Sequence, residues 1–175
     1  MSEILVKVKK EKRLIEEIET LIPGFRGYKM RELRREADKL VRDYIVRKLK
    51  EAKDNLKECM LIVAENDRAE LYGLINRISA LLDLVTSKIE HADYGYSGFF
   101  DAVKIKVDEL EKLLEYDNSL IKSANEIVTA SKSAQDLAND LKFDELSSKL
   151  REFKKLLDRF DELINQRENI ILGVK

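Results

Sequence analysis

The sequence predicts an all-α protein, a long antiparallel helical bundle of four main helices plus a shorter N-terminal helix. Its 175 residues are 44% apolar and 38% charged, with a single proline, a composition typical of long packed helices and unlike that of disordered chains. Apolar residues recur at alternating spacings of three and four, which indicates helices packed along one another. No run approaches the roughly 18 apolar residues of a membrane span, so none is predicted.

The first predicted helix covers about Val6 to Leu21, and its apolar stripe is Leu14, Ile15, Ile18 and Leu21. It ends before Pro23, because proline disfavours helical backbone in the residue that precedes it. We therefore expect residues 1–22 to form an N-terminal helix, either packed on the bundle or held as an exchangeable arm. Residues 23–29 are expected to form an elbow.

The next two predicted helices form a hairpin. The second helix runs from about Met30 to Glu65, and its core positions are Tyr44 or Ile45, Leu49, Ala52, Leu56, Cys59 and Val63. The third helix continues to about His91, and Asp67 with Glu70 makes a capping-box pattern at its start. Its apolar face is expected to hold Leu71, Leu74, Ile75, Ile78, Leu81, Leu82, Val85 and Ile89.

The last two predicted helices form a second hairpin. Asp108 with Glu111 gives another capping-box pattern, for a fourth helix that reaches about Leu141 without a glycine or proline to interrupt it. Its seam positions are Leu113, Asp117, Leu120, Ala124, Ile127, Ala134, Leu137 or Ala138, and Leu141. Asp144 is the expected N-cap of the fifth helix. The seam of that helix holds Leu146, Leu150, Phe153, Leu157, Phe160, Ile164 and Ile171.

The helix lengths place the segment 92–106, which is rich in glycine and aromatic residues. At about 1.5 Å per residue the second helix is roughly 54 Å long and the third only about 36 Å. Short turns near Asn66 and Lys142 make successive helices antiparallel, so the third helix returns only part of the way. We expect segment 92–106 to cover the rest as a loop, at the same end as the elbow and the C-terminus.

The chain lacks the residue patterns that catalysis and metal binding require. It has one histidine, His91, and one cysteine, Cys59, whereas a metal site needs several ligands and a di-iron bundle needs paired Glu-x-x-His motifs. Ser97 has only that one histidine to serve as its base. We therefore expect no catalytic residues, no metal ligands and no cofactor. Cys59 is expected to be a small buried hydrophobe, and His91 to cap its helix.

Residues 26–50 carry ten lysines and arginines against four acids, a surplus of +6 in a chain whose net charge is −1. An arginine-rich helix start can bind phosphate or RNA, although a solvated face or intramolecular ion pairs would produce the same pattern. Together with segment 92–106, the hypothetical ligand-binding residues are Arg26, Arg31, Arg34, Arg35, His91, Asp93, Tyr94 and Tyr96. Phe99 and Phe100 are expected to pack on the bundle end.

Asp117 is the one charged residue in the predicted seam of the fourth helix. A charge in an apolar seam needs a partner, because an unpaired buried charge costs several kcal/mol. We predict a structural ion pair in which Asp117 is buried. Its expected partners are the arginines of residues 31–35, or Tyr94 or Tyr96 from the covering segment.

The stretches PGFRGYKMRELRREADKLVRD and HADYGYSGFFDAVKIKVDELEKLLEYD resemble the two signature stretches of an uncharacterised family of all-helical prokaryotic proteins. The resemblance spans residues 21–117. It implies that the elbow and segment 92–106 belong to one structural unit. Because that family has no established activity, the resemblance implies no function.

These observations favour a non-catalytic protein–protein interaction or scaffolding module, whose protein partner the sequence does not identify. The alternative is a binder of RNA or a phosphate-bearing ligand through the Arg-rich start of the second helix. The first residues do not form a secretory signal, so the expected location is cytoplasmic, and long helical faces are compatible with a homo-oligomer. Abundant lysine and glutamate and the absence of tryptophan are compatible with a thermophilic source.

Overall fold

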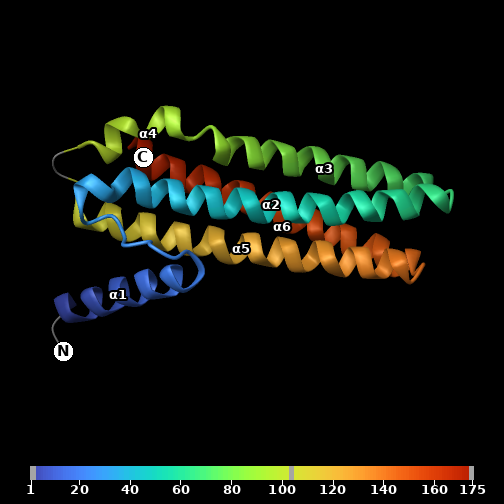
Figure 1. The fold of residues 1–175 in the computed structure, drawn as a ribbon, viewed down its shortest axis with the longest axis horizontal. Helices are drawn as coiled ribbons and strands as arrows, with labels where there is room; N and C mark the ends of the chain where they lie inside the picture. The colour runs from blue at the N-terminus through green and yellow to red at the C-terminus, as the bar shows by residue number, and fades with distance from the viewer. Residues whose placement is uncertain (1–2, 103–104, 174–175) are drawn as a thin grey trace.

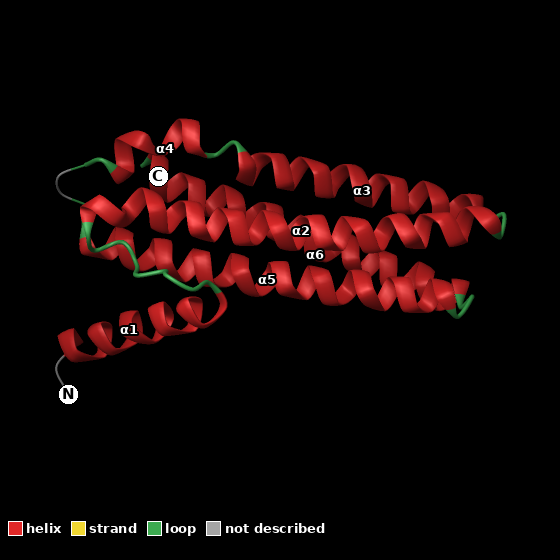
Figure 2. Ribbon diagram, viewed as in Figure 1, coloured by secondary structure: helices red, strands yellow, loops and turns green. Residues whose placement is uncertain are grey.

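The computed structural model describes residues 3–102 and 105–173 (Figure 1). Every regular element in these ranges is helical (Figure 2), which confirms the all-α fold class. The elements are α1 (Glu3–Leu21), the short 3₁₀ helix η1 (Arg31–Leu33), α2 (Arg34–Glu65), α3 (Ala69–Glu90), α4 (Asp93–Phe100), α5 (Val107–Asn139) and α6 (Phe143–Leu172). No helix in the described ranges is long and apolar enough to cross a membrane.

The four long helices form a bundle in which α2 and α6 each pack against both α3 and α5. Short turns make α2 antiparallel to α3 and α5 antiparallel to α6, as predicted. Between the two hairpins the helices run parallel (Figure 1). Tyr44 of α2 hydrogen-bonds Asn125 of α5, and farther along both helices Asn55 hydrogen-bonds Ser131. The bundle therefore consists of two antiparallel hairpins lying side by side in the same direction.

The connection from α3 to α5 crosses one end of this bundle, because these two helices are diagonal neighbours rather than adjacent ones. Part of the crossover is the helix α4, which packs on α6, so the prediction of a loop throughout 92–106 was wrong. Tyr96 and Phe100 are both buried, and their spacing of four needs a helical turn to bring both rings to one face. We call this end, which also holds the elbow at 23–29, the elbow end.

The predicted seams of α2, α5 and α6 account for most of the core. All the predicted seam residues of α2 and α6 are buried, and α5 is continuous as predicted. In α3, Leu74 and Leu81 are only half-buried because they flank the seam. Leu141 is 53% exposed and Leu21 is 42% exposed, so both predictions were wrong. Leu141 lies beyond the end of α5, and Ile22 takes the buried position next to Leu21.

Both hairpin turns contain a residue with left-handed backbone, Asp67 (φ 55°) and Leu141 (φ 57°). In the second turn the N–H of Leu141 donates to the carbonyl of Ala138, and the N–H of Lys142 donates to the carbonyl of Leu137. This is the Schellman arrangement, which satisfies the last carbonyls of a helix. Asp67 has the equivalent position after α2 and therefore belongs to the end of that helix.

The predicted helix N-caps were consequently wrong. The N-cap positions are Arg68 for α3, Lys106 for α5 and Lys142 for α6, and none of the three makes a side-chain cap hydrogen bond. Asp108 and Asp144 lie instead in the first turns of their helices. A carboxylate there still interacts favourably with the positive end of the helix dipole.

The first helix, α1, lies beside the first half of α5 (Figure 1). Lys7 pairs with Asp108 at 3.3 Å, and ten residues farther along α1 Glu17 pairs with Lys122 at 3.1 Å. Ile18 is fully buried at this contact. The two helices are thus parallel, and ion pairs at the edges of α1 hold much of the interface.

The elbow passes close to α1 at Gly27, which has φ +76°. A Cβ atom added there would lie 2.9 Å from the Cδ1 atom of Ile15. Only glycine adopts this backbone conformation without strain and leaves room for that contact. The sequence therefore ties the C-terminal half of α1 to the elbow.

Candidate functional site

The elbow end contains a buried cluster of charged side chains, namely Asp38 and Arg42 of α2, Asp117 of α5 and Arg167 of α6, called here the charged cluster. Arg167 donates from Nε to Asp117 Oδ1 at 2.6 Å and from Nη2 to Asp38 Oδ1 at 2.7 Å. Arg42 Nε donates to the other oxygen of Asp38 at 2.8 Å. All four residues are at most 6% exposed, and two carboxylates balance two guanidinium groups. The cluster joins three helices through charges that are shielded from water.

Tyr28 connects the elbow to this cluster. Its hydroxyl donates to Asp117 Oδ2 at 2.5 Å. The buried guanidinium of Arg34 donates to the backbone carbonyl of Tyr28 at 2.8 Å and to that of Ala102 at 3.0 Å. One arginine therefore holds the elbow and the crossover together.

Aromatic rings from the elbow and α4 pack around these charges. The Tyr28 ring stacks on Phe100 and meets Phe25 edge-on, with centroids 5.8 Å apart in both cases. The guanidinium carbon of Arg167 lies 5.6 Å from the centroid of the Tyr96 ring, a cation–π contact. The predicted packing of Phe100 on the bundle end is confirmed. Because these aromatic rings exclude water and lower the local dielectric constant, they strengthen the hydrogen bonds between the charged groups.

Burial and the neighbouring charges together set the pKa values in the charged cluster and at Tyr28. Burial raises the pKa of the Asp117 carboxyl, although Arg167 and Tyr28 act in the opposite direction. Burial and the neighbouring carboxylate of Asp117 also raise the pKa of Tyr28 well above its ordinary value, so this hydroxyl keeps the proton that it donates. Burial alone would lower the pKa of Arg167, but Asp117 and Asp38 outweigh it and raise that pKa well above its usual value. Tyr28 and Arg167 are therefore both held in their proton-donating forms.

The predicted burial of Asp117 is confirmed, since the residue is 0% exposed, and it forms an ion pair. Its partners are Arg167 and Tyr28, so the prediction of an arginine from residues 31–35 was wrong. The reason is that Arg34 turns toward backbone carbonyls, whereas the end of α6 reaches the level of Asp117.

The seam spacing contained the signal for these missed partners. In α6, Arg167 follows Ile164 by three residues and precedes Ile171 by four, so it occupies a seam position. In α2, the spacing of three and four extends back from the apolar seam to Asp38 and then to Arg34. Charged residues at seam positions of three helices, all near one end, indicate a buried network. Tyr28, in the elbow, has no periodic signal of this kind.

The four arginines of the hypothetical ligand site do not converge. Arg34 is buried as described, and Arg35 makes a bidentate pair with Asp101, with Nε at 2.8 Å from Oδ1. Arg31 is exposed beside that pair, and Arg26 is exposed at a separate cavity. The start of α2 therefore offers exposed cations at two places rather than one composite phosphate site.

The remaining members of the hypothetical site are also dispersed. His91 is the C-cap residue of α3, as predicted, and its backbone N–H donates to the carbonyl of Ser87 while its side chain is exposed. Tyr96 is 3% exposed and packs in the elbow end. The side chains of Asp93 and Tyr94 lie outside the described residues.

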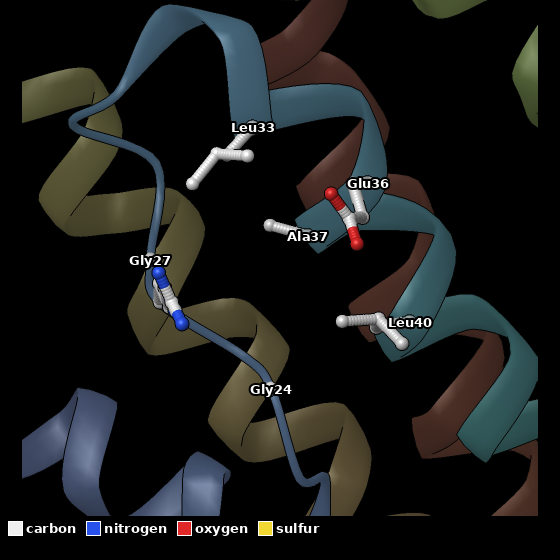
Figure 3. A pocket seen from close by; sticks show the side chains of 7 residues that line it. Gly24, Gly27, Leu33, Glu36, Ala37 and Leu40 are labelled. Atoms are coloured by element: carbon white, nitrogen blue, oxygen red, sulfur yellow. The ribbon is translucent and has the colours of Figure 1, made fainter.

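A cavity of about 300 Å³ lies between the elbow and α2 (Figure 3). Its walls are Gly24, Arg26 and Gly27 of the elbow, and Leu33, Glu36, Ala37 and Leu40 of η1 and α2. The charged side chains of Arg26 and Glu36 are both exposed. The described lining thus offers an apolar wall and two charges of opposite sign, which is not an arrangement of acid, base and nucleophile.

A second depression, called here the end groove, lies where α4, the crossover, the start of α5 and the end of α6 meet. It measures about 410 Å³ and is lined by Gly98, Phe99, Ala102, Ile105, Glu109, Ile170, Ile171, Leu172 and Gly173. Glu109 is the one charged residue among these described lining residues. Several large apolar side chains nearby are more than half exposed, namely Leu5, Val6 and Val8 of α1, Val107 of α5 and Leu172 of α6.

No group of three or more histidines, cysteines or acids among the described residues is arranged to hold a metal ion. Cys59 is buried, and its thiol lies 3.9 Å from the carbonyl oxygen of Ala134. Burial raises the pKa of this thiol to about 11, so it is a poor nucleophile at neutral pH. The predicted buried position of Cys59 is confirmed.

Comparison of the chain with protein-family models, with curated proteins and with solved structures gives no match. The resemblance of its two stretches to a helical prokaryotic family therefore stays a prediction. The case for a function depends on the geometry described above.

Proposed function

We propose that this chain is a non-catalytic protein–protein interaction module whose binding surface is the elbow end. The observation that carries the proposal is the exposed apolar surface there. The pairing of Lys7 with Asp108 places the start of α1 beside Val107, and Val107 is close in sequence to Ile105 and Glu109 of the end groove. Exposed apolar side chains concentrated at one end of a molecule favour a surface that a partner covers.

The charged cluster supports the same proposal, because its buried polar atoms already hydrogen-bond to other groups within the protein. Every buried polar side-chain atom among the described residues has a hydrogen-bond partner. Catalytic and ligand-binding sites usually keep some polar groups available to a substrate. The cluster is better suited to holding the elbow and the crossover rigidly in place beneath the exposed surface.

Binding of RNA or a phosphate-bearing ligand is the alternative proposal, and the exposed side chains of Arg26 and Arg31 favour it. Two arginines at separate places give few phosphate contacts, so the expected binding is weak and strongly dependent on salt. Arg26→Gln combined with Arg31→Gln would abolish binding of this kind and leave an apolar protein interface intact.

The interaction proposal is tested by affinity capture from an extract of the native cells, with quantification of the proteins recovered. The informative variant is Leu5→Asp combined with Val8→Asp. Its matched control is Leu61→Asp combined with Leu84→Asp, because these leucines are 60% and 51% exposed but lie away from the elbow end. We expect the wild type and the control to recover the same proteins, and the Leu5/Val8 variant to lose them.

Circular dichroism of each purified variant checks that the fold is retained. Equal recovery of partner proteins by the Leu5/Val8 variant and the control would overturn the proposed binding surface. Recovery of RNA that is lost only in the Arg26/Arg31 variant would favour the alternative instead.

A further inference from the structure

The cavity between the elbow and α2 has an aliphatic wall. Leu33, Ala37 and Leu40 are spaced by four and three residues, so they lie on one face of η1 and the start of α2. Figure 3 shows their side chains pointing toward the glycines of the elbow. None of the described lining residues is aromatic. Asp38 and Arg42, which belong to the charged cluster, pair with each other on a different face of α2, so the cavity is separate from that cluster.

The described lining of this cavity has one charged side chain on each side, Arg26 on the elbow and Glu36 on α2. Within the part of the chain that the structure describes, neither side chain forms an ion pair or a hydrogen bond. By contrast, the neighbouring Arg35 pairs with Asp101. A guanidinium group pairs with a carboxylate, and a carboxylate pairs with an ammonium group. The cavity thus offers one partner for each charge of a zwitterion.

The elbow contributes glycine backbone to the cavity. Gly24 has φ +90°, and a Cβ atom added there would meet no atom within 4 Å. Glycine allows a backbone to approach a ligand closely, so that its N–H and C=O groups become additional hydrogen-bond partners. The cavity volume is about 300 Å³, which at about 30 Å³ per water molecule gives room for about ten water molecules. A ligand with about ten non-hydrogen atoms therefore fits.

We propose that this cavity binds a free α-amino acid with an aliphatic side chain, such as leucine or isoleucine. Arg26 pairs with the carboxylate of the ligand, Glu36 pairs with its ammonium group, and the aliphatic wall contacts its side chain. A ligand with a single charge would leave either Arg26 or Glu36 without a partner, whereas a zwitterion pairs with both. This binding site goes beyond the proposed interaction function and does not depend on it.

The test is a titration of the isotopically labelled full chain with L-leucine, in which NMR follows the chemical shifts of the backbone amides. We expect a dissociation constant on the order of 1 mM, because a ligand of this size forms few contacts. The amides of Gly24 and Gly27 are expected to shift. The amides of Asp67 and Leu141, in the turns at the other end of the bundle, are expected to stay unchanged.

Three analogues of leucine separate the parts of this recognition. 4-Methylpentanoate lacks the ammonium group, 3-methylbutylamine lacks the carboxylate, and glycine lacks the aliphatic side chain. Each analogue is expected to bind at least about tenfold more weakly than leucine, because each loses either a charge-assisted hydrogen bond or the burial of apolar surface.

Two variants assign the charged partners. Arg26→Gln is expected to weaken leucine binding about tenfold but to leave the binding of 3-methylbutylamine unchanged, since that analogue has no carboxylate. Glu36→Gln is expected to weaken leucine binding by a similar factor but not to weaken the binding of 4-methylpentanoate. The matched controls are Arg31→Gln and Glu32→Gln, because both residues are exposed in η1 and neither lines the cavity. Both controls are expected to bind leucine as the wild type does, and circular dichroism checks that every variant is folded.

Unchanged shifts at Gly24 and Gly27 at leucine concentrations well above the expected dissociation constant would overturn the proposal. Equal binding of leucine and either singly charged analogue would also overturn it, as would equal losses of affinity in the Arg26 variant and its Arg31 control. None of these results bears on the proteins captured by the Leu5/Val8 variant, so the interaction function is decided separately.

Discussion

At the scale of single residues, the most consequential side chain is Arg167. Its guanidinium contacts both acids of the charged cluster and also faces the Tyr96 ring. Removing one partner from a buried ionic network costs more than the network itself contributes, because the remaining charge is left without compensation.

Arg167→Met is accordingly expected to lower the free energy of unfolding by about 3–5 kcal/mol. The substitution keeps an unbranched side chain of similar length but leaves Asp117 without its cation. Urea denaturation followed by circular dichroism measures the effect. Arg159→Met, at an exposed position of the same helix, is the control and is expected to change stability by less than about 0.5 kcal/mol. Similar midpoints for the two variants would show that the ion pairs contribute little.

Leu120 tests the apolar part of the same seam. The residue is fully buried, so Leu120→Ala removes buried methyl groups and leaves a cavity, at a cost of about 2–5 kcal/mol. Leu61→Ala is the control, because Leu61 is 60% exposed. An unchanged urea midpoint for Leu120→Ala would contradict the observed register of α5.

At the scale of elements, helix interiors followed from the sequence more closely than helix ends did. The spacing of three and four identified the seams of α2, α3, α5 and α6, because burial on one face imposes that period. The ends depended on backbone conformation at Asp67 and Leu141, which residue type does not determine. The helix α4 was missed because its two glycines suggested a loop, whereas packing of Tyr96 and Phe100 on the bundle favours a helix.

The turn at Leu141 gives a prediction about backbone strain. A leucine in the left-handed region costs about 1–2 kcal/mol relative to glycine, and the exposed side chain contributes little packing. Leu141→Gly is expected to raise the free energy of unfolding by about 0.5–1 kcal/mol. Asp67→Gly, at the equivalent position of the other hairpin, should give a smaller gain because aspartate tolerates this conformation better. The reverse order in urea melts would contradict this account of the two turns.

The attachment of α1 to α5 is expected to depend on pH through Glu17. Hydrogen bonds from Arg13, Lys122 and Asn118 lower the pKa of Glu17 from 4.5 to about 2. A lowered pKa in the folded state stabilises the fold above the ordinary pKa, and the contribution is lost as the pH falls from about 4.5 toward about 2. Glu17→Gln is therefore expected to lose less stability than wild type over that range.

Thermal melts of wild type and Glu17→Gln at a series of acidic pH values measure this difference. Glu19→Gln, at an exposed position of α1, serves as the control and should follow the wild-type curve. Identical pH dependence in wild type and Glu17→Gln would show that the carboxylate does not help to hold α1.

At the scale of the whole molecule, the two ends of the bundle differ. One end has two tight turns, whereas the elbow end holds the elbow and the crossover (Figure 1). The charged cluster and several exposed apolar side chains lie at the elbow end as well. The helix-length argument placed segment 92–106 at this end correctly, because a short third helix must be followed by a long return. The diagonal order of the helices had no signal in the sequence, since seam spacing does not reveal which helices are adjacent.

Amide hydrogen exchange should reflect this architecture. Amides in the buried seam of α5, for example at Leu120 and Ile127, are expected to exchange only through global unfolding. Amides from Lys7 to Lys10 lie in a helix segment without a buried residue and are expected to exchange far faster when the chain is dilute. Protection of Lys7 to Lys10 equal to that of α5 under dilute conditions would contradict the observed packing of α1.

The placement of charges in the seams also bears on how the two hairpins select their alignment. Apolar seams of similar period can slide past one another by seven residues and still bury leucine against leucine. Such a slip would break the ion pair between Asp38 on one hairpin and Arg167 on the other, so that each buried charge would keep only the partner in its own hairpin, Arg42 for Asp38 and Asp117 for Arg167. We expect the loss of this buried pair to disfavour shifted dockings, so that α2 and α6 assemble in a single register.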